Sequence, residues 1–258
     1  MRQDERTPFH QALQRARLSA YDPGEFVGQE SFMRADEILS LAVRAGVGPG
    51  TSVLDLCCGV AGPGRYITSE LGCTYLGVDL SADAIGIARE RAGDLPCRFE
   101  VARIPPLPAG TFDVVLLLET ILAFADKQSL LAKIASALPD GGRFAFTVEE
   151  GQPLTEAERQ AMPDADTVWL LPLSLLHSSL EEVGLRVSWV QEHSDAHREM
   201  ADALASSFAA DRWAIAAQVG DQAVDELLAA HRLWSQWLRD GRVRKFAVVA
   251  EKIGPAPG

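Results

Sequence analysis

The chain has 258 residues, 47% of them hydrophobic and 23% charged, the balance of an ordinary globular protein. Its net charge of −12 argues against DNA, RNA and membrane surfaces as partners, because binding to phosphates requires a basic face. No apolar run reaches the roughly 18 residues of a membrane span, and the first residues lack the apolar segment of a secretory signal. We therefore expect a cytoplasmic protein.

The first predicted element is a helix before residue 48, where apolar residues from Phe32 to Ala42 recur at helical spacing. From about 51 to 191, strand-like and helix-like segments alternate, which is typical of a parallel sheet wound by right-handed crossovers. We expect strands at 51–57, 73–80, 97–102, 111–119, 143–149 and 185–191, and helices at 63–71, 82–92, 127–138 and 174–183.

A long helical stretch follows at about 195–240, and residues 242–252 form a last strand. Because this strand comes after an inserted helical region, we expect it to lie antiparallel at an edge of the sheet, beside a helical cap. The predicted fold class is α/β: a Rossmann-like doubly wound sheet, mostly parallel with an antiparallel final edge strand, plus a helical cap.

A glycine-rich turn follows the first predicted strand, in the sequence VLDLCCGVAGPG at 53–64. Small residues at such a turn let the backbone approach a ligand closely. Asp79 ends the second strand, twenty residues after Gly59, where its carboxylate can accept both hydroxyls of an adenosine ribose. Together the two features predict nucleotide binding.

The turn does not fit a dinucleotide, because Ala61 stands at the middle glycine of the GxGxxG fingerprint. Asp55, two residues before the turn, would repel a pyrophosphate but suits an ammonium group. The stretch instead resembles the first motif of class I S-adenosylmethionine-dependent methyltransferases, which has the form hydrophobic-Leu-Asp-x-Gly-Cys-Gly-x-Gly-Gly. Further matches to this family are GVDLS at 77–81, PLPAGTFDVVLLLE at 106–119 and LPDGGRFAF at 138–146.

The resemblance implies the cofactor S-adenosyl-L-methionine and assigns it a set of contacts. Asp55, Cys57 and Gly59 would lie along its methionine end. Asp79 would bind the ribose hydroxyls, and Leu80 would flank the adenine.

Further contacts are implied on both sides of the turn. The backbone amide of Ala102 would bind the adenine edge, and Glu119 would face the amino-acid portion or the substrate. In the family the N-terminal segment often folds over the cofactor, which would make Tyr21 and Gln29 contacts. The alternative for this segment is a helix N-cap at Ser31.

The chain departs from the family pattern at three positions. Cys57 and Ala61 replace glycines of the turn, and both are small enough to keep it. Val101 stands where an acidic residue usually precedes Ala102, so the adenine amino group would lose a side-chain partner.

The candidate catalytic residues follow strand ends, because ligands of open α/β sheets lie beyond the carboxyl ends of the strands. His193 is the first candidate for a general base or a substrate-orienting group, and Glu149 and Glu119 come next. The alternative for each is a solvated loop residue. His193 and His197 lie four residues apart, but without a third ligand in view we expect no metal site.

We expect a methyltransferase that acts on O, N or C of a small molecule, such as a secondary metabolite. A cyclase or isomerase that keeps the cofactor without transferring its methyl, and a non-catalytic binding or regulatory subunit, remain alternatives. Association into a homodimer stays open. The expected organisation is an N-terminal segment over the cofactor site at 1–48, a cofactor-binding core at 49–192, a helical cap or substrate insertion at 193–241, and a final strand and tail at 242–258.

Overall fold

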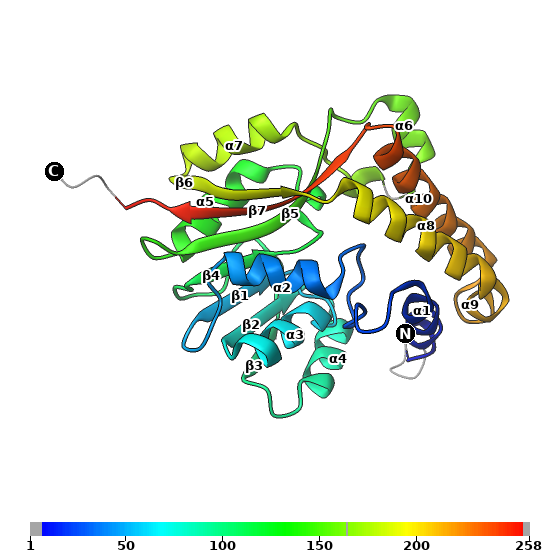
Figure 1. The fold of residues 1–258 in the computed structure, drawn as a ribbon, viewed down its shortest axis with the longest axis horizontal. Coiled ribbons are helices and arrows are strands. Elements are labelled where there is room, and N and C mark those ends of the chain that lie inside the picture. Colours follow the sequence, from blue (N-terminus) through cyan, green and yellow to red (C-terminus); the bar gives the residue numbers. More distant parts are fainter. Residues whose placement is uncertain (1–6, 164, 255–258) are drawn as a thin grey trace.

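A seven-stranded sheet in the order β3-β2-β1-β4-β5-β7-β6 forms the centre of the fold (Figure 1). The structure is a computed structural model, and it describes residues 7–163 and 165–254. The central strands are buried on both faces, in agreement with their continuous apolar sequences. The strands are β1 Ser52–Leu56, β2 Thr74–Asp79, β3 Cys97–Val101, β4 Val114–Leu117, β5 Arg143–Glu150, β6 Leu185–Glu192 and β7 Arg244–Lys252.

The first five strands pair parallel, and β7 pairs antiparallel with both β5 and β6. This confirms the Rossmann-like, mostly parallel sheet with an antiparallel final strand. We expected that strand at the edge, but it lies one place inside, and β6 is the edge strand. The burial of side chains agrees with this order, because β7 is buried without interruption over most of its length, whereas β6 alternates and becomes exposed.

Helices cover both faces of the sheet, and each layer has its own apolar core. One core contains residues of α2, α3 and α4, and the other contains residues of α5 and α7. These helices are α2 Ala35–Arg44, α3 Gly62–Leu71, α4 Ala82–Ala92, α5 Lys127–Ala137 and α7 Leu173–Glu182.

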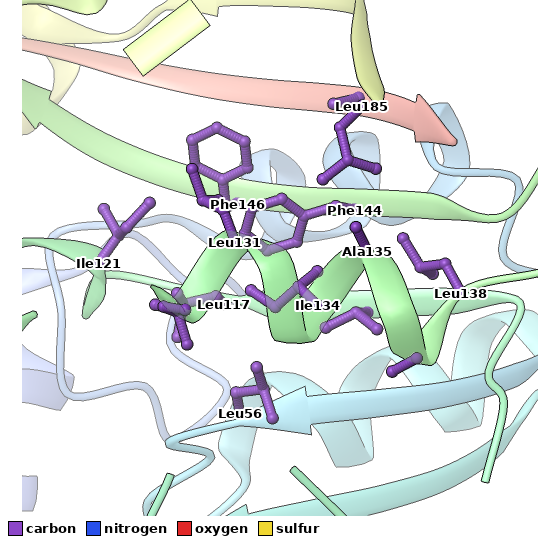
Figure 2. Close-up of a cluster of buried hydrophobic side chains, with 14 of the residues drawn as sticks. Leu56, Leu117, Ile121, Leu131, Ile134, Ala135, Leu138, Phe144, Phe146 and Leu185 are labelled. Atoms are coloured by element: carbon purple, nitrogen blue, oxygen red, sulfur yellow. The ribbon is translucent and has the colours of Figure 1, made fainter. Parts of the chain in front are cut away.

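Helix α5 shows how the local sequence produces this packing. The Asp126 side chain caps the helix by accepting a hydrogen bond from the Ser129 amide at 2.9 Å. Leu131 and Ile134 then face the sheet, where Phe146 is among the aromatic residues beside them (Figure 2). Each such side chain, fully buried, contributes roughly 1.5–3 kcal/mol to stability.

A helical layer stands beyond the carboxyl ends of the parallel strands, at the right of Figure 1. It consists of α8 Ser194–Ala210, α9 Arg212–Val219 and α10 Asp221–Arg239, joined by the N-terminal helix α1 Thr7–Ala20. Their shared core includes Leu13, Tyr21, Leu204, Phe208 and Val224. The N-terminal segment therefore packs on the cap through α1 and on the sheet through α2.

Short helices occur in stretches for which we predicted no helix or strand, namely η2 Ile121–Ala123, α6 Glu156–Ala161 and η3 Ala165–Thr167. Helix α6 begins with a capping box in which Thr155 and Glu158 exchange hydrogen bonds. The expected tail from residue 255 onward lies outside the described residues. Within the described part of the chain, no helix combines the length and apolar character of a membrane span.

Candidate functional site

The turn after β1 adopts a left-handed backbone at three positions. Cys57, Gly59 and Ala61 have φ angles of 59°, 54° and 55°. For Cys57 and Ala61 this conformation costs about 1–2 kcal/mol each, because their Cβ atoms crowd the next carbonyl. The turn therefore keeps its shape at both positions where glycine is replaced. Burial, together with the charges of two nearby aspartates, raises the pKa of the Cys57 thiol to about 12, so it stays protonated.

The glycines at the start of α3 permit close contacts with other elements. A Cβ atom on Gly62 would lie 2.3 Å from the backbone of Gly28, and one on Gly64 would lie 2.1 Å from the Tyr75 ring. The first contact places the N-terminal segment against the turn. The second lets the Tyr75 hydroxyl reach under α3 and donate to Asp55 Oδ2 at 2.5 Å.

Asp55 is buried at the end of β1. Burial raises its pKa to about 7 from an ordinary 3.8, although the hydrogen bond from Tyr75 opposes the change. A carboxylate in such a place favours a cationic ligand, because a positive charge nearby would restore its ionised form.

Asp79 lies at the end of β2, beside the same turn. Its Oδ2 accepts a hydrogen bond from the Gly59 amide at 2.9 Å, and its Oδ1 accepts one from the Ser81 amide at 2.8 Å. These bonds fix the carboxylate at the ligand-binding edge and tie the turn to the second strand.

A first cavity of about 270 Å³ lies over this turn. Its walls come from the turn itself, from the N-terminal segment 28–33 and from the residues after β4. Of the predicted cofactor contacts, six line it: Gln29, Asp55, Cys57, Gly59, Asp79 and Glu119.

The other predicted cofactor contacts lie outside that lining. The Tyr21 hydroxyl donates a hydrogen bond to the Ser31 carbonyl at 2.5 Å and so stabilises the N-terminal segment 28–33. Leu80 is 58% exposed just after β2. The Ala102 amide already donates to the Asp79 carbonyl at 2.9 Å, because the hydrogen bonds between β2 and β3 continue through Ala102, the last residue of the predicted strand. This amide is therefore not free for an adenine edge.

Gln29 organises the N-terminal segment. Its Nε2 atom donates to the carbonyls of Glu25 and Met33, both at 2.8 Å, and its Oε1 accepts from the Val27 amide at 2.7 Å. Ser31 is not the N-cap of α2, because the helix begins at Ala35.

A second cavity, of about 280 Å³, lies between the sheet and the cap. It shares Glu30, Ser31 and Glu119 with the first cavity, so the two meet at this wall. The rest of its lining comes mainly from α10 and the chain around α6, with single residues from other elements: Arg17, Phe32, Leu122, Glu149, Met162, Pro163, Thr167, Val168, Leu204, Ala230, His231 and Trp234.

Glu119 is held in place at the junction by neighbours on β5 and β7. It has a left-handed φ of 61°, and the Thr147 hydroxyl donates to its Oε1 at 2.7 Å. Lys245 Nζ lies 2.5 Å from Glu119 Oε1 and 2.6 Å from Glu149 Oε1. Burial is the largest single influence and would raise the pKa of Glu119, but the Lys245 charge, together with the hydrogen bonds from Lys245 and Thr147 and the other positive charge nearby, holds that pKa below its usual range.

His193 lies in a different cluster, outside the linings of both cavities. Its Nδ1 is 2.9 Å from Glu37 Oε1, and His197 Nε2 is 3.3 Å from Glu37 Oε2. Burial would raise the pKa of Glu37, but the hydrogen bonds from the two histidines hold it well below its usual range. This placement favours a structural role for His193.

We missed Lys245, Glu37 and Glu30 in the sequence. A signal existed for Lys245, which directly precedes the apolar run at 246–250, where a buried cation requires an acidic partner. No group of three or more metal-ligating side chains occurs among the described residues.

Comparisons with known proteins agree with this geometry. Residues 53–142 match the family model described as a methyltransferase domain. An uncharacterized methyltransferase of Synechocystis is 30% identical over 158 residues, which cover 57% of this chain and 71% of that protein. The chain belongs to the class I S-adenosylmethionine-dependent methyltransferase family. The methyltransferase fold thus accounts for the sheet, the turn and the first cavity.

Other methyltransferases are similar over different lengths. Phosphoethanolamine N-methyltransferase 3 of Arabidopsis thaliana is 37% identical over 103 residues, 38% of this chain and 21% of that protein. The chain therefore spans about a fifth of the length of that relative. The structure of Haemonchus contortus phosphoethanolamine N-methyltransferase 2, in complex with phosphomonomethylethanolamine and S-adenosylhomocysteine, has a TM-score of 0.78 and 22% identity, covering 95% of this chain and 60% of that one. This likeness shows a shared fold.

The residues of the first cavity fit the cofactor of the family, S-adenosyl-L-methionine. Asp55 offers a carboxylate suited to the ammonium group, and Asp79 offers one suited to the ribose hydroxyls. An added Cβ on Gly59 would meet no protein atom within 4 Å, so this position borders open space.

Proposed function

We propose that the protein transfers the methyl group of S-adenosylmethionine to an O, N or C atom of a small-molecule metabolite. The observation that carries this proposal is the meeting of the two cavities at Glu30, Ser31 and Glu119. Methyl transfer requires the donor and the acceptor to be in contact and in line, and cavities that share lining residues are adjacent, as such contact demands.

The cofactor supplies an activated methyl group, so the protein's own task is alignment and exclusion of water. In our proposal Asp79 and Asp55 orient the two ends of the cofactor. The segment around Gln29 closes over it, and Glu119 lies where the donor and the acceptor meet.

The size and position of the second cavity support a small acceptor. Its volume of about 280 Å³ lies near the lower end of ordinary ligand sites. Residues of α1, α8 and α10 line this cavity, so the cap would cover an acceptor that binds there. The similarity to phosphoethanolamine N-methyltransferases is consistent with a small metabolite as substrate.

The test begins with binding of S-adenosylhomocysteine, measured by calorimetry, to the wild type and to Asp79→Asn. Loss of the charged hydrogen-bond acceptor should reduce the binding free energy of S-adenosylhomocysteine by about 2–3 kcal/mol, which corresponds to a roughly 30- to 140-fold weaker affinity. Asparagine can still accept one of the two backbone hydrogen bonds, which limits damage to the turn. Asp94→Asn, an exposed position, removes the same charge as a control and should bind normally.

Incubation with candidate metabolites should then release S-adenosylhomocysteine as a stoichiometric product. The cyclase or isomerase alternative would be supported if the protein bound the cofactor tightly and converted a metabolite without releasing S-adenosylhomocysteine. Absence of cofactor binding in the folded wild type would support a non-catalytic subunit. Equal affinities of the wild type and Asp79→Asn would remove Asp79 from the ribose site.

A further inference from the structure

The second cavity contains a buried carboxylate with a vacant hydrogen-bonding position. Glu149 is only 8% exposed and lines this cavity. Its Oε1 accepts a hydrogen bond from Lys245 Nζ at 2.6 Å, whereas its Oε2 is buried without a partner among the described residues. A buried carboxylate oxygen without a donor is unfavourable by about 1–3 kcal/mol or more, so the site favours a ligand that supplies one.

The charges around this oxygen also favour a cation. The described carboxylates of the cavity are Glu30, Glu119 and Glu149. Arg17 neutralises Glu30 at 2.9 Å, and the single Lys245 bridges the two other glutamates. Among these lining residues and Lys245, the carboxylates therefore outnumber the Lys and Arg side chains by one, and this balance favours a cationic ligand.

Aromatic side chains complete the environment. Phe32, His231 and Trp234 line the same cavity, and the rings of Phe32 and His231 are 5.5 Å apart, edge to face. Burial lowers the pKa of His231, so its ring adds no positive charge at neutral pH. Faces of aromatic rings attract ammonium groups, by about 0.5–2 kcal/mol each.

We propose that the methyl acceptor is an amine which enters protonated, donates a hydrogen bond to Glu149 Oε2 and gives its proton to this carboxylate. The proposal rests on the proposed function and names the acceptor class for it. Burial raises the pKa of Glu149, which makes the carboxylate a better proton acceptor.

The steps balance as follows. The ammonium loses one proton to Glu149, which becomes a neutral carboxylic acid, and the nitrogen regains its lone pair. That lone pair forms the new N–C bond to the donor methyl, while the C–S bond breaks and leaves its electron pair on sulfur. The methylated product carries the positive charge, and Glu149 returns its proton to water when the product leaves.

Paired probes of nearly equal shape test the proposal with the full chain: butylamine against butanol, benzylamine against benzyl alcohol, and phenethylamine against 2-phenylethanol. Calorimetry measures binding of each probe in the presence of S-adenosylhomocysteine, and release of S-adenosylhomocysteine from the donor measures turnover. At least one amine should bind and react ten or more times better than its alcohol.

Glu149→Gln keeps an acceptor for Lys245 but removes the charge and the base. This substitution should lower the preference for the amine over its alcohol at least tenfold, and it should lower turnover of the amine about 10²–10⁴-fold. Glu150→Gln is the matched control, because Glu150 pairs with Arg244 at 2.7 Å outside the cavity and should leave both quantities unchanged. Circular dichroism and binding of S-adenosylhomocysteine show that each variant is folded.

Alcohols that equal the amines, amines that all fail to bind, or an unchanged preference in Glu149→Gln would each overturn the amine proposal. These results differ from failure of the proposed function, in which S-adenosylhomocysteine itself does not bind.

Discussion

Replacement of Asp55 by asparagine should remove a large pH dependence of stability. The folded-state pKa of about 7 lies above the ordinary 3.8, so the folded protein holds a proton that the unfolded chain has released. The contribution of Asp55 to stability is then greatest below pH 4, falls as the pH rises and levels off above pH 7, since each pH unit within this window costs about 1.4 kcal/mol. Between pH 5 and pH 8 the loss should be about 3 kcal/mol, without a discount for screening because Asp55 is buried.

Urea unfolding of the cofactor-free protein at pH 5, 6, 7 and 8 measures this loss. Other groups titrate in the same range, so the informative quantity is the difference between the wild type and Asp55→Asn at each pH. Asparagine keeps a carbonyl that can accept from the Tyr75 hydroxyl. If the difference changed by less than about 1 kcal/mol from pH 5 to pH 8, the carboxyl would not be held protonated and the reasoning would be wrong.

Three further predictions test other parts of the structure. Lys245→Met leaves the two bridged glutamates without their cation and should destabilise the protein by about 3–5 kcal/mol in urea unfolding; a change below 1 kcal/mol would contradict the bridge. Gly86→Ala, in the interior of α4 with open space beside it, should raise stability by about 0.5–1 kcal/mol, whereas Gly72→Ala, at a φ of 72°, should lower it by about 1–2 kcal/mol. The same sign for both would refute the backbone argument. His193→Ala should keep turnover within about tenfold of the wild type, and a hundredfold loss with unchanged unfolding would restore a catalytic role.

The strands and the central helices could be predicted because their signals are local. Apolar runs and glycine turns mark β1 to β5 within a few residues of their bounds. The position of β7 between β5 and β6 could not be predicted from such local signals, since the order of strands depends on hydrogen bonds between distant segments. Helix α6 did have a local signal, the capping box from Thr155 to Glu158, which we did not use.

The candidate site was partly predictable for the same reason. Asp55, Gly59 and Asp79 belong to a contiguous motif and its neighbouring strand, and all three line the first cavity. The bridge from Lys245 to Glu119 joins residues more than a hundred positions apart, and sequence spacing carries no information about such contacts. His193 was expected at the crevice from its place after β6, but the following helix turns its ring toward α2.

In the arrangement that we propose, the wall shared by the two cavities makes binding of the cofactor and binding of the acceptor interdependent. Segment 28–33 borders both sites, and its Gly28 is packed tightly on Gly62 at the start of α3. A ligand that orders this segment from one side alters the free energy of ordering it from the other. By thermodynamic reciprocity, the factor by which the cofactor changes the dissociation constant of the acceptor must equal the factor by which the acceptor changes that of the cofactor.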